Sequence, residues 1–423
     1  MTREQKAPKK IISIRLLFLL LLLLIPHTAQ ALLLGPIEFL PTLELTGVYD
    51  DNIFLRAEGN PLLPVEEDFI GRIIPAVSFA YSRGRTNFLL GYRNEFLFHK
   101  NFPERDAKGE NHGFNIAAAH AFGPRSSVSL DDFFRIGTDI SSIAAGGLEG
   151  LPQAGILPRG RDYRTNDLRL GGTHALTRRW DLTGDIAYQY RWYGSSLEGQ
   201  PGDALQTETE DHLESIFLTG AYAWTPRHAL TARLGFSHND YDLRGRARYL
   251  TASVGYRGQI AKPLNIEGSA GLQYLNEDSR PDTGIPRQES VWPVADLSGT
   301  YALGDLSVLA AASVGLSDTS GFGGTAIRRQ VRLSVDYRPW DPFGLRAFGL
   351  YTKSDSTSDD PRDALDLEAF QGGCEGTYRF NSWILARLQY TYIDQDSSGT
   401  IGGSYKDNRA LLSLVLSLPE TLK

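Results

Sequence analysis

The stretch Trp180–Tyr193, WDLTGDIAYQYRWY, decides the fold. Read at a period of two, its side chains divide into an apolar set and a mostly polar set. The apolar set is Trp180, Leu182, Gly184, Ile186, Tyr188, Tyr190 and Trp192, and the other is Asp181, Thr183, Asp185, Ala187, Gln189, Arg191 and Tyr193. An apolar strand face about ten residues long with aromatic residues at both ends is typical of a strand that crosses a bilayer.

The rest of the chain repeats this unit. Alternating segments recur about 18 times from Thr42 to Leu418. Tight turns such as Arg83-Gly84-Arg85 alternate along the chain with long connections such as Gly137–Asp162. This layout predicts an all-β fold, a transmembrane antiparallel up-and-down β-barrel of about 18 strands, with about 16 as the alternative.

Aromatic residues support the membrane over a soluble β-propeller or sandwich, which would also contain many short strands. Two girdles are predicted, one beside the tight turns and one toward the long loops. The first comprises Tyr81, Phe122, Trp180, Trp224, Tyr301, Tyr337 and Trp383, and the second comprises Phe98, Trp192, Tyr241, Tyr274 and Tyr390. A propeller is expected to repeat a motif in each blade, and the sequence shows no repeat beyond the alternation.

The first residues have the pattern of a cleaved signal peptide. Lys9, Lys10 and Arg15 precede the apolar run Leu16–Ile25, and Ala29-Gln30-Ala31 supplies the small residues of a cleavage site. We therefore expect four parts: a signal peptide (1–31), a short periplasmic segment (32–41), the barrel (42–418) and a C-terminal tail (419–423). These features predict export to the outer membrane of a Gram-negative bacterium.

Composition narrows the choice of partners. Five of the 43 Lys and Arg residues and one of the 50 Asp and Glu residues lie in 1–31, which leaves 38 basic and 49 acidic residues after cleavage. This acidic balance argues against nucleic acid. The expected surroundings are outer-membrane lipid and lipopolysaccharide, the barrel-assembly machinery, a small polar solute and a second copy in a homo-oligomer. Cys374 is the single cysteine, so the chain has no intramolecular disulfide.

A short motif resembles a known family. The segment Tyr49-Asp50-Asp51-Asn52-Ile53-Phe54 is similar to the end of the first strand in outer-membrane β-barrel porin families. Such families are often encoded near exopolysaccharide secretion systems, so the resemblance implies an outer-membrane barrel and an accessory or structural role in exopolysaccharide export as an alternative function. The chain departs from the common barrel pattern at its end, Pro-Glu-Thr-Leu-Lys, where many barrels end in an aromatic residue.

Oxygen-rich clusters raise the question of metal binding. Asp50-Asp51-Asn52 has ligands that suit Ca²⁺, but such residues at a strand end more often form turns. The calcium-loop imitation that starts at Asp394 has Tyr405 where a bidentate Glu is required. The acidic residues Glu66, Glu67, Asp68, Asp359 and Asp360 are interpreted as a solvated rim, with cation bridges to lipopolysaccharide as the alternative. We therefore predict no metal and no cofactor.

An outer-membrane hydrolase is the least favoured function. Ser237-His238-Asn239-Asp240 has the residue types of a nucleophilic relay. Neighbouring residues in a strand point to opposite faces, so these cannot form a relay by themselves. We expect no catalytic residue and no enzyme activity.

The polar phase of the strands predicts a charged lumen. A barrel of this size is wide enough for water, and charges inside it must be solvated or paired. The candidate lumen-lining residues are Arg93, Glu95, Arg169, Asp185, Arg191, Arg233, Arg257, Glu267, Asp296, Arg332, Asp336, Glu375, Arg387 and Arg409. They favour a channel for passive diffusion of small polar solutes; the alternative is that they form ladders that brace the wall.

The longest connection, Gly137–Asp162, is unusually apolar. Its candidate constriction residues are Ile143, Leu148, Leu151 and Ile156, which would be costly to leave in water. The prediction is that this loop folds into the barrel mouth, as a loop does in general porins; the alternative is a mobile Gly/Pro linker.

Overall fold

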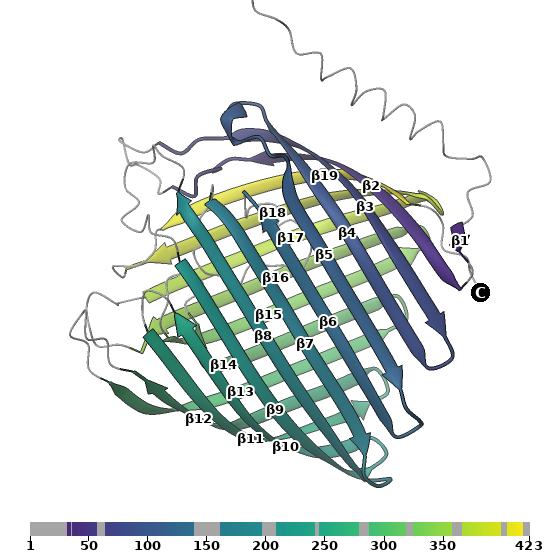
Figure 1. Cartoon of the computed structure of the whole chain (residues 1–423), viewed down its shortest axis with the longest axis vertical. Coiled ribbons are helices and arrows are strands. Elements are labelled where there is room, and N and C mark those ends of the chain that lie inside the picture. The colour runs from purple at the N-terminus through teal and green to yellow at the C-terminus, as the bar shows by residue number, and fades with distance from the viewer. Residues whose placement is uncertain are drawn as a thin grey trace, which may run out of the picture.

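The computed structural model is a closed barrel of 18 antiparallel strands, β2 to β19 (Figure 1). Each strand pairs with its neighbours in the sequence, and pairing of β19 with β2 closes the ring. The structure describes residues 32–34, 36–56, 64–138, 161–196, 209–241, 245–278, 287–318, 325–357, 366–398 and 404–417. It confirms the predicted all-β fold and the larger of the two strand numbers.

The strands are long, as a tilted wall requires. Their bounds are β1 Leu32–Leu34, β2 Ile37–Asp50, β3 Asp68–Arg83, β4 Thr86–His99, β5 Lys108–Ala121, β6 Ser126–Gly137, β7 Arg161–Ala175, β8 Trp180–Ser196, β9 Thr209–Thr225, β10 His228–Tyr241, β11 Gly245–Ala261, β12 Leu264–Glu277, β13 Gln288–Leu303, β14 Leu306–Asp318, β15 Thr325–Trp340, β16 Phe343–Ser356, β17 Asp366–Asn381, β18 Ile384–Ser397 and β19 Tyr405–Ser417. A short 3₁₀ helix, η1 Pro103–Arg105, lies between β4 and β5. No helix in the described ranges is long and apolar enough to cross a membrane.

The tight turns gather at one end of the barrel and the long connections at the other (Figure 1). Gly84 and Gly304 occupy two of the tight turns with φ of 62° and 56°, a left-handed conformation that glycine adopts without steric cost. Strand β1 and the end of β19 at Ser417 lie at the tight-turn end. The alternation of turn lengths read from the sequence therefore corresponds to the two ends of the barrel.

The two faces of the wall differ in chemistry. Leu234, Val254 and Leu272 are 61%, 69% and 58% exposed, and the register places them on one continuous face. This apolar face is the outer one, and the polar set of each strand points into the barrel. Most girdle aromatics lie on the outer face, but Tyr241 is wrongly assigned: it points inward and is buried because a hairpin of the same chain covers it.

The beginning of the barrel differs from the predicted boundary. Strand β2 starts at Ile37, and β1 pairs with its first residues, so much of the expected segment 32–41 belongs to the sheet. Pro41 lies within β2, although proline cannot donate to a ladder. Among the described residues, β19 pairs with β2 from Thr42 to Asp50, so no described β19 residue lies opposite Pro41.

Candidate functional site

The inner face of the barrel carries the charged side chains. The register places all fourteen predicted lumen-lining residues, from Arg93 on β4 to Arg409 on β19, on the face opposite the exposed apolar one. The sequence could place them because strand side chains alternate strictly. An open path through the barrel depends on two features: which of these charges are paired, and which parts of the chain narrow the lumen.

Five ion pairs brace the wall on the strands around the β19–β2 seam. Arg72 on β3 pairs with Glu95 on β4, and both side chains are buried. Arg387 on β18 lies 3.7 Å from Glu375 on the neighbouring β17 and 4.0 Å from Glu44 on β2, which lies beyond β19. Further pairs join Arg346 to Asp336 at 2.6 Å and Arg409 to Asp50 at 3.2 Å. This part of the wall therefore forms the bracing ladder that was the alternative to a solvated lumen.

Strands β9 to β12 arrange their inward charges differently. The Arg233 guanidinium lies 3.9 Å from the centre of the Phe217 ring, a cation–π contact. Arg257 lies opposite Glu267 in the register, and both line a hollow of about 590 Å³ near the tight turns. Asp181, Ser298 and Thr300 line the same hollow. These groups offer charge and hydrogen bonds to water or solute at the end of the barrel opposite the long loops.

The segment Asp50–Asn52 forms a clasp between the first and last barrel strands. Asn52 is almost fully buried, and its amide donates to the carbonyls of Arg56 at 2.8 Å and Lys406 at 2.7 Å while its oxygen accepts from the Arg56 N–H. The Asp51 carboxylate accepts from the backbone and side-chain N–H groups of Asn408, both at 2.7 Å. Asp50 accepts from the Asn52 N–H. The side-chain oxygens that were considered as Ca²⁺ ligands thus accept hydrogen bonds from N–H groups of this chain.

Removing the Asn52 amide should loosen this clasp. Asn52→Ala leaves two buried carbonyls and one N–H without their partner, a loss of roughly 1–3 kcal/mol of unfolding free energy. Urea titration of the detergent-refolded protein, followed by the gel shift between folded and heated forms, measures it. Asn101→Ala is the control, because its amide contacts the Glu67 carbonyl at an exposed position and should cost less.

Next to the clasp, the chain packs an apolar cluster into the mouth of the barrel. Ile53 is 2% exposed and belongs to one buried cluster with the inward side chains Val48, Ile70, Leu97 and Leu411. The Phe54 ring stacks edge-on against Phe102, with ring centres 5.0 Å apart. The segment after β2 therefore folds inward over this part of the wall.

A buried pair fastens the neighbouring loop. The Asp68 carboxylate lies 2.9 Å from His99 Nδ1, and both side chains are fully buried. Asp68 also accepts from the Asn101 N–H at 2.9 Å, and Asp106 accepts from the His99 N–H at 2.8 Å. The expectation that Asp68 belongs to a solvated rim is wrong, because its carboxylate organises the connection between β4 and β5. Glu66 pairs with Arg56 at 3.1 Å, and Asp359 and Asp360 lie outside the described residues.

A second inward element is the end of the β14–β15 hairpin, which the sequence reasoning missed. The Leu316 N–H donates to Gln273 Oε1 at 3.0 Å, and the Thr325 hydroxyl lies 2.9 Å from the Tyr249 hydroxyl. Gln273 and Tyr249 are inward side chains of β12 and β11. Leu316 also packs against the buried cluster of Tyr241, Ala247, Tyr249 and Leu275. The hairpin end therefore lies inside the barrel, against the wall.

The signal for this inward turn is a proline. Strands β13 and β14 pair only as far as Ala295 and Val314, two residues short of Pro293. Pro293 has no N–H to extend a ladder, and beyond this point β14 leaves the wall. Gly315 permits the close approach, since a Cβ there would lie 3.2 Å from Val294 Cγ2.

The two inward elements face each other. The clasp and apolar cluster belong to β2–β4 and β19, and the hairpin end covers β10–β12; β2 and β11 are nine strands apart in a ring of 18. Both lie at the long-loop end. The predicted constriction loop lies outside the described residues, so its inward fold remains a prediction. Its candidate residues are Ile143, Leu148, Leu151 and Ile156.

The Ser237–Asp240 segment does not assemble a relay. Ser237 lies opposite Ser215 and Tyr249 on the inner phase, whereas His238 lies opposite Glu214 and Arg248 on the outer phase. The wall of the barrel separates the two side chains, as strand alternation requires. Among the described residues no group of three or more His, Cys, Asp or Glu side chains is placed to hold a metal ion.

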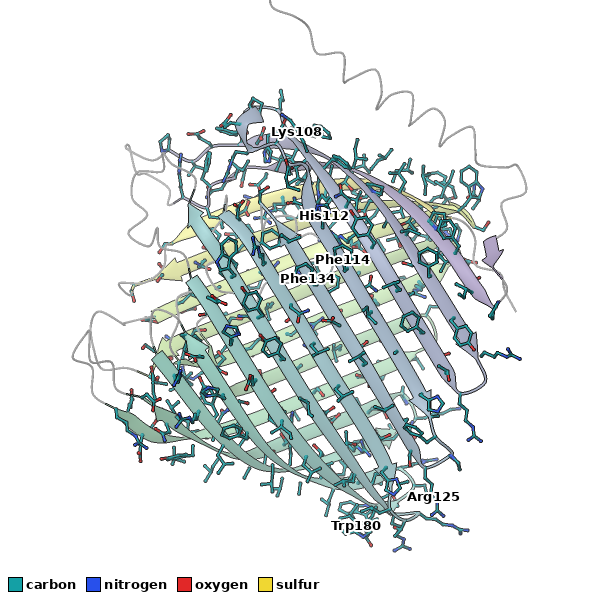
Figure 2. The ribbon with its side chains drawn as sticks, in the orientation of Figure 1. Lys108, His112, Phe114, Arg125, Phe134 and Trp180 are labelled. Carbon is teal, nitrogen blue, oxygen red and sulfur yellow. The ribbon has the colours of Figure 1, made fainter. Side chains whose placement is uncertain are left out.

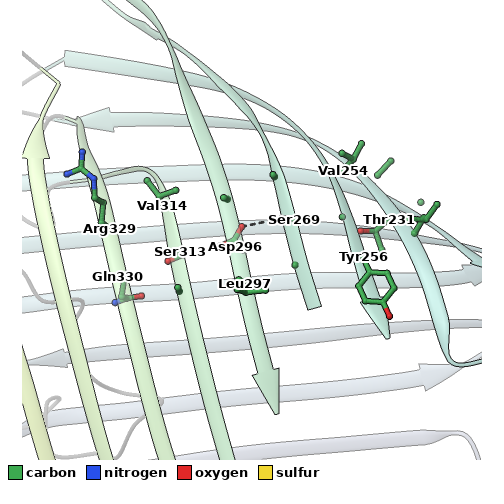
Figure 3. Close-up of a pocket in the computed structure, with 18 of the residues that line it drawn as sticks. Thr231, Val254, Tyr256, Ser269, Asp296, Leu297, Ser313, Val314, Arg329 and Gln330 are labelled. Atoms are coloured by element: carbon green, nitrogen blue, oxygen red, sulfur yellow. Dashed lines mark hydrogen bonds between the residues drawn. The ribbon is translucent and has the colours of Figure 1, made fainter. Parts of the chain in front are cut away.

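A hollow of about 980 Å³ lies across strands β8 to β16 (Figure 3). Most of its lining residues belong to the outer phase, among them Val254, Leu297 and Val314. Small residues on neighbouring strands, such as Ala232, Gly268 and Ala312, create the depression. Because its walls are apolar and face outward, it lies outside the candidate path for polar solutes.

Comparisons with known proteins give remote likenesses. No family model and no curated protein matches the chain. The solved structure of Pseudomonas aeruginosa OpdK with vanillate is 11% identical, with a TM-score of 0.44 and coverage of 90% of this chain and 98% of that one. OccK2 (OpdF) of the same organism in complex with glucuronate is 12% identical, with a TM-score of 0.45 and coverage of 92% and 100%. The FrpB iron transporter from Neisseria meningitidis is 10% identical, with a TM-score of 0.46 and coverage of 85% and 64%.

Proposed function

We propose that this chain is a channel for passive diffusion of small polar solutes across the outer membrane of a Gram-negative bacterium. The observation that carries the proposal is the division of one closed wall into an exposed apolar outer face and a charged inner face. A barrel of 18 strands is wide enough to hold an aqueous path. No energy source and no catalytic group is part of the proposal.

The path has two parts with different roles. At the long-loop end it passes between the clasp with its apolar cluster and the β14–β15 hairpin end, and these opposed elements select by size. Toward the tight turns it passes the inward charges of β8–β12, where Arg257, Glu267 and Asp181 solvate a polar solute. Both signs of charge line this part, so the channel should discriminate only weakly between anions and cations.

The expected partners follow from this location. We propose that residues 1–31 are cleaved on export, that the barrel-assembly machinery inserts the barrel, and that outer-membrane lipid and lipopolysaccharide surround it. The accessory role in exopolysaccharide export rests on the motif Tyr49, Asp50, Asp51, Asn52 and Phe54. The side chains of Asp50, Asp51, Asn52 and Phe54 make contacts within the barrel mouth, and Tyr49 lies on the outer face.

Single-channel recording in planar bilayers tests the proposed function. The purified protein should produce discrete current steps that grow linearly with voltage and with salt concentration. A folded barrel that inserts but carries no current would contradict the channel and favour the accessory role. The gel shift between unheated and heated samples verifies folding in the same preparation.

Shortening the β14–β15 hairpin should widen the path. Replacing Leu316–Ile327 by a two-residue Asn-Gly turn removes the described end that lies inside the barrel, so larger current steps are expected. Deleting Ala144–Gln153 in the β6–β7 connection is the parallel test for the apolar loop. Unchanged current from a folded hairpin variant would show that this hairpin does not narrow the channel.

A further inference from the structure

The tight turns of the barrel carry an excess of basic side chains. Within three residues of the eight tight turns, all of which the structure describes, there are nine basic and three acidic residues. The basic ones are Arg83, Arg85, Arg125, Arg178, Arg179, Arg227, Lys262, Arg338 and Arg379, and the acidic ones are Asp181, Asp305 and Asp341. The chain as a whole has the opposite balance, with 43 Lys and Arg residues and 50 Asp and Glu residues. This end of the barrel is therefore positive although the protein is acidic.

Five of these side chains form a basic patch on three adjacent turns. They are Arg83 and Arg85 at the β3–β4 turn, Arg125 at the β5–β6 turn, and Arg178 and Arg179 at the β7–β8 turn. Backbone hydrogen bonds join the turns into one rim, because the Arg85, Arg125 and Arg179 carbonyls accept the N–H groups of Ala121, Ala175 and Ala223 on the next strands. Figure 2 shows Arg125 and Trp180 at this end of the barrel. The other five turns carry four basic and two acidic residues, so the positive charge is concentrated in the basic patch.

The charge of the basic patch is not cancelled by its neighbours. All five residues are exposed, and none of them forms an ion pair in the part of the chain that the structure describes. Asp181, the acidic residue of these turns, belongs to the inward set of β8 and lines the hollow inside the barrel. Outward basic residues at the long-loop end differ, because each pairs with a carboxylate. These paired residues are Arg246, Arg248, Arg287, Arg329 and Lys353.

The basic patch borders the apolar outer face. Arg179 Nη1 donates to the Tyr222 hydroxyl at 3.4 Å, and Arg85 Nη1 donates to the Phe122 carbonyl at 3.3 Å. Tyr222 lies opposite the outward Trp180 in the register, and Phe122 is 68% exposed. Both guanidinium groups therefore lie along the outer rim, beside the aromatic girdle, where a bilayer places its polar headgroups. Apolar side chains next to cations match the acyl chains and the phosphate of one phospholipid.

We propose that the basic patch binds the headgroups of anionic phospholipids in the periplasmic leaflet of the outer membrane. This inference rests on the proposed outer-membrane location, with the tight turns in the periplasm. Guanidinium groups donate charge-assisted hydrogen bonds to phosphate oxygens, and each Arg near an anionic membrane surface strengthens binding roughly five-fold. An acidic periplasmic protein would need the same charge but not a position on the lipid-facing rim, so the location of the patch favours the lipid.

Native mass spectrometry of the folded barrel tests this proposal. The protein is released from mixed micelles that contain equal amounts of anionic phosphatidylglycerol and net-neutral phosphatidylcholine, and the lipids that stay bound are counted. The wild-type protein should retain phosphatidylglycerol in preference by about five-fold or more, and added salt should reduce the preference. A variant with Gln in place of all five Arg residues of the basic patch should retain the two lipids equally. Arg85→Gln/Arg179→Gln, which removes the two guanidinium groups on the rim, replaces it if the larger variant does not fold.

The matched control removes five charges from the other end of the barrel. Its substitutions are Arg246→Gln, Arg248→Gln, Arg287→Gln, Arg329→Gln and Lys353→Gln, which change the net charge by the same amount, so the preference for phosphatidylglycerol should persist. Equal loss of the preference in both variants, or no preference in the wild-type protein, would overturn the proposal. The gel shift between unheated and heated samples verifies folding. The folded patch variant should still produce current steps, so failure of this proposal is distinguishable from failure of the proposed channel.

Discussion

Leu234→Arg is expected to prevent most of the protein from inserting into lipid. Leu234 is 61% exposed on the outer face, opposite Leu218 and Ala252 in the register, and an Arg near mid-membrane costs roughly 2–4 kcal/mol. The fraction folded into vesicles, measured by gel shift over a urea series, should fall accordingly. Ile186→Arg, which replaces another outward residue, should act in the same way.

The control for this experiment is Ala187→Arg. Ala187 faces the lumen opposite Ser215 and Arg169, so an added guanidinium there meets water and should cost far less. Gly235 is a poor control although it also points inward, because the Phe217 ring covers the space where a side chain would begin. Equal losses for Leu234→Arg and Ala187→Arg would show that the two faces are wrongly assigned.

Glu95→Ala is expected to destabilise the barrel by roughly 3–5 kcal/mol, because it removes one member of a buried ion pair. The Arg72 and Glu95 side chains are 7% and 3% exposed, and Arg72 Nε donates to Glu95 Oε1 at 2.6 Å. The variant leaves the guanidinium buried without this carboxylate. The midpoint of urea unfolding, read from the gel shift, measures the loss.

Two companion variants separate burial from charge. Asp336→Ala breaks the pair with Arg346, whose side chains are 38% and 36% exposed, and should cost roughly 0–1 kcal/mol. The double variant Arg72→Met/Glu95→Leu should recover much of the lost stability, because apolar groups of similar volume can replace a buried pair. A loss for Glu95→Ala no larger than that for Asp336→Ala would contradict the assignment of this pair as a buried one.

Strand alternation made most of the wall predictable from the sequence. Trp180–Tyr193 lies within β8. The inward direction of residues such as Arg169 and Glu267 follows from the period of two in a strand. A one-residue error in assigning that period would have reversed the inner and outer faces. The first strand was predicted to start at Thr42, but β2 begins at Ile37, because β1 and β3 both pair with its first residues.

The features that narrow the barrel were less accessible to sequence reasoning. Tyr241 has the composition and position of a girdle residue, and only the path of the β14–β15 hairpin explains why it is buried. That path depends on contacts between Thr325 and Tyr249, residues 76 positions apart, which local patterns do not encode. Asp68 likewise looked like a rim carboxylate because its partner His99 lies 31 residues away.

The clasp between the first and last barrel strands also has a consequence for the order in which the barrel folds. Asn52 and Asp51 bind Lys406 and Asn408, partners 354 and 357 residues later in the chain. Synthesis runs from the N-terminus, and contacts between distant residues form late because the intervening chain must first be gathered. While the barrel assembles, the buried amide of Asn52 therefore lacks one of its two acceptors until β19 arrives. A chain truncated before Lys406 would therefore lack the residues that complete the clasp.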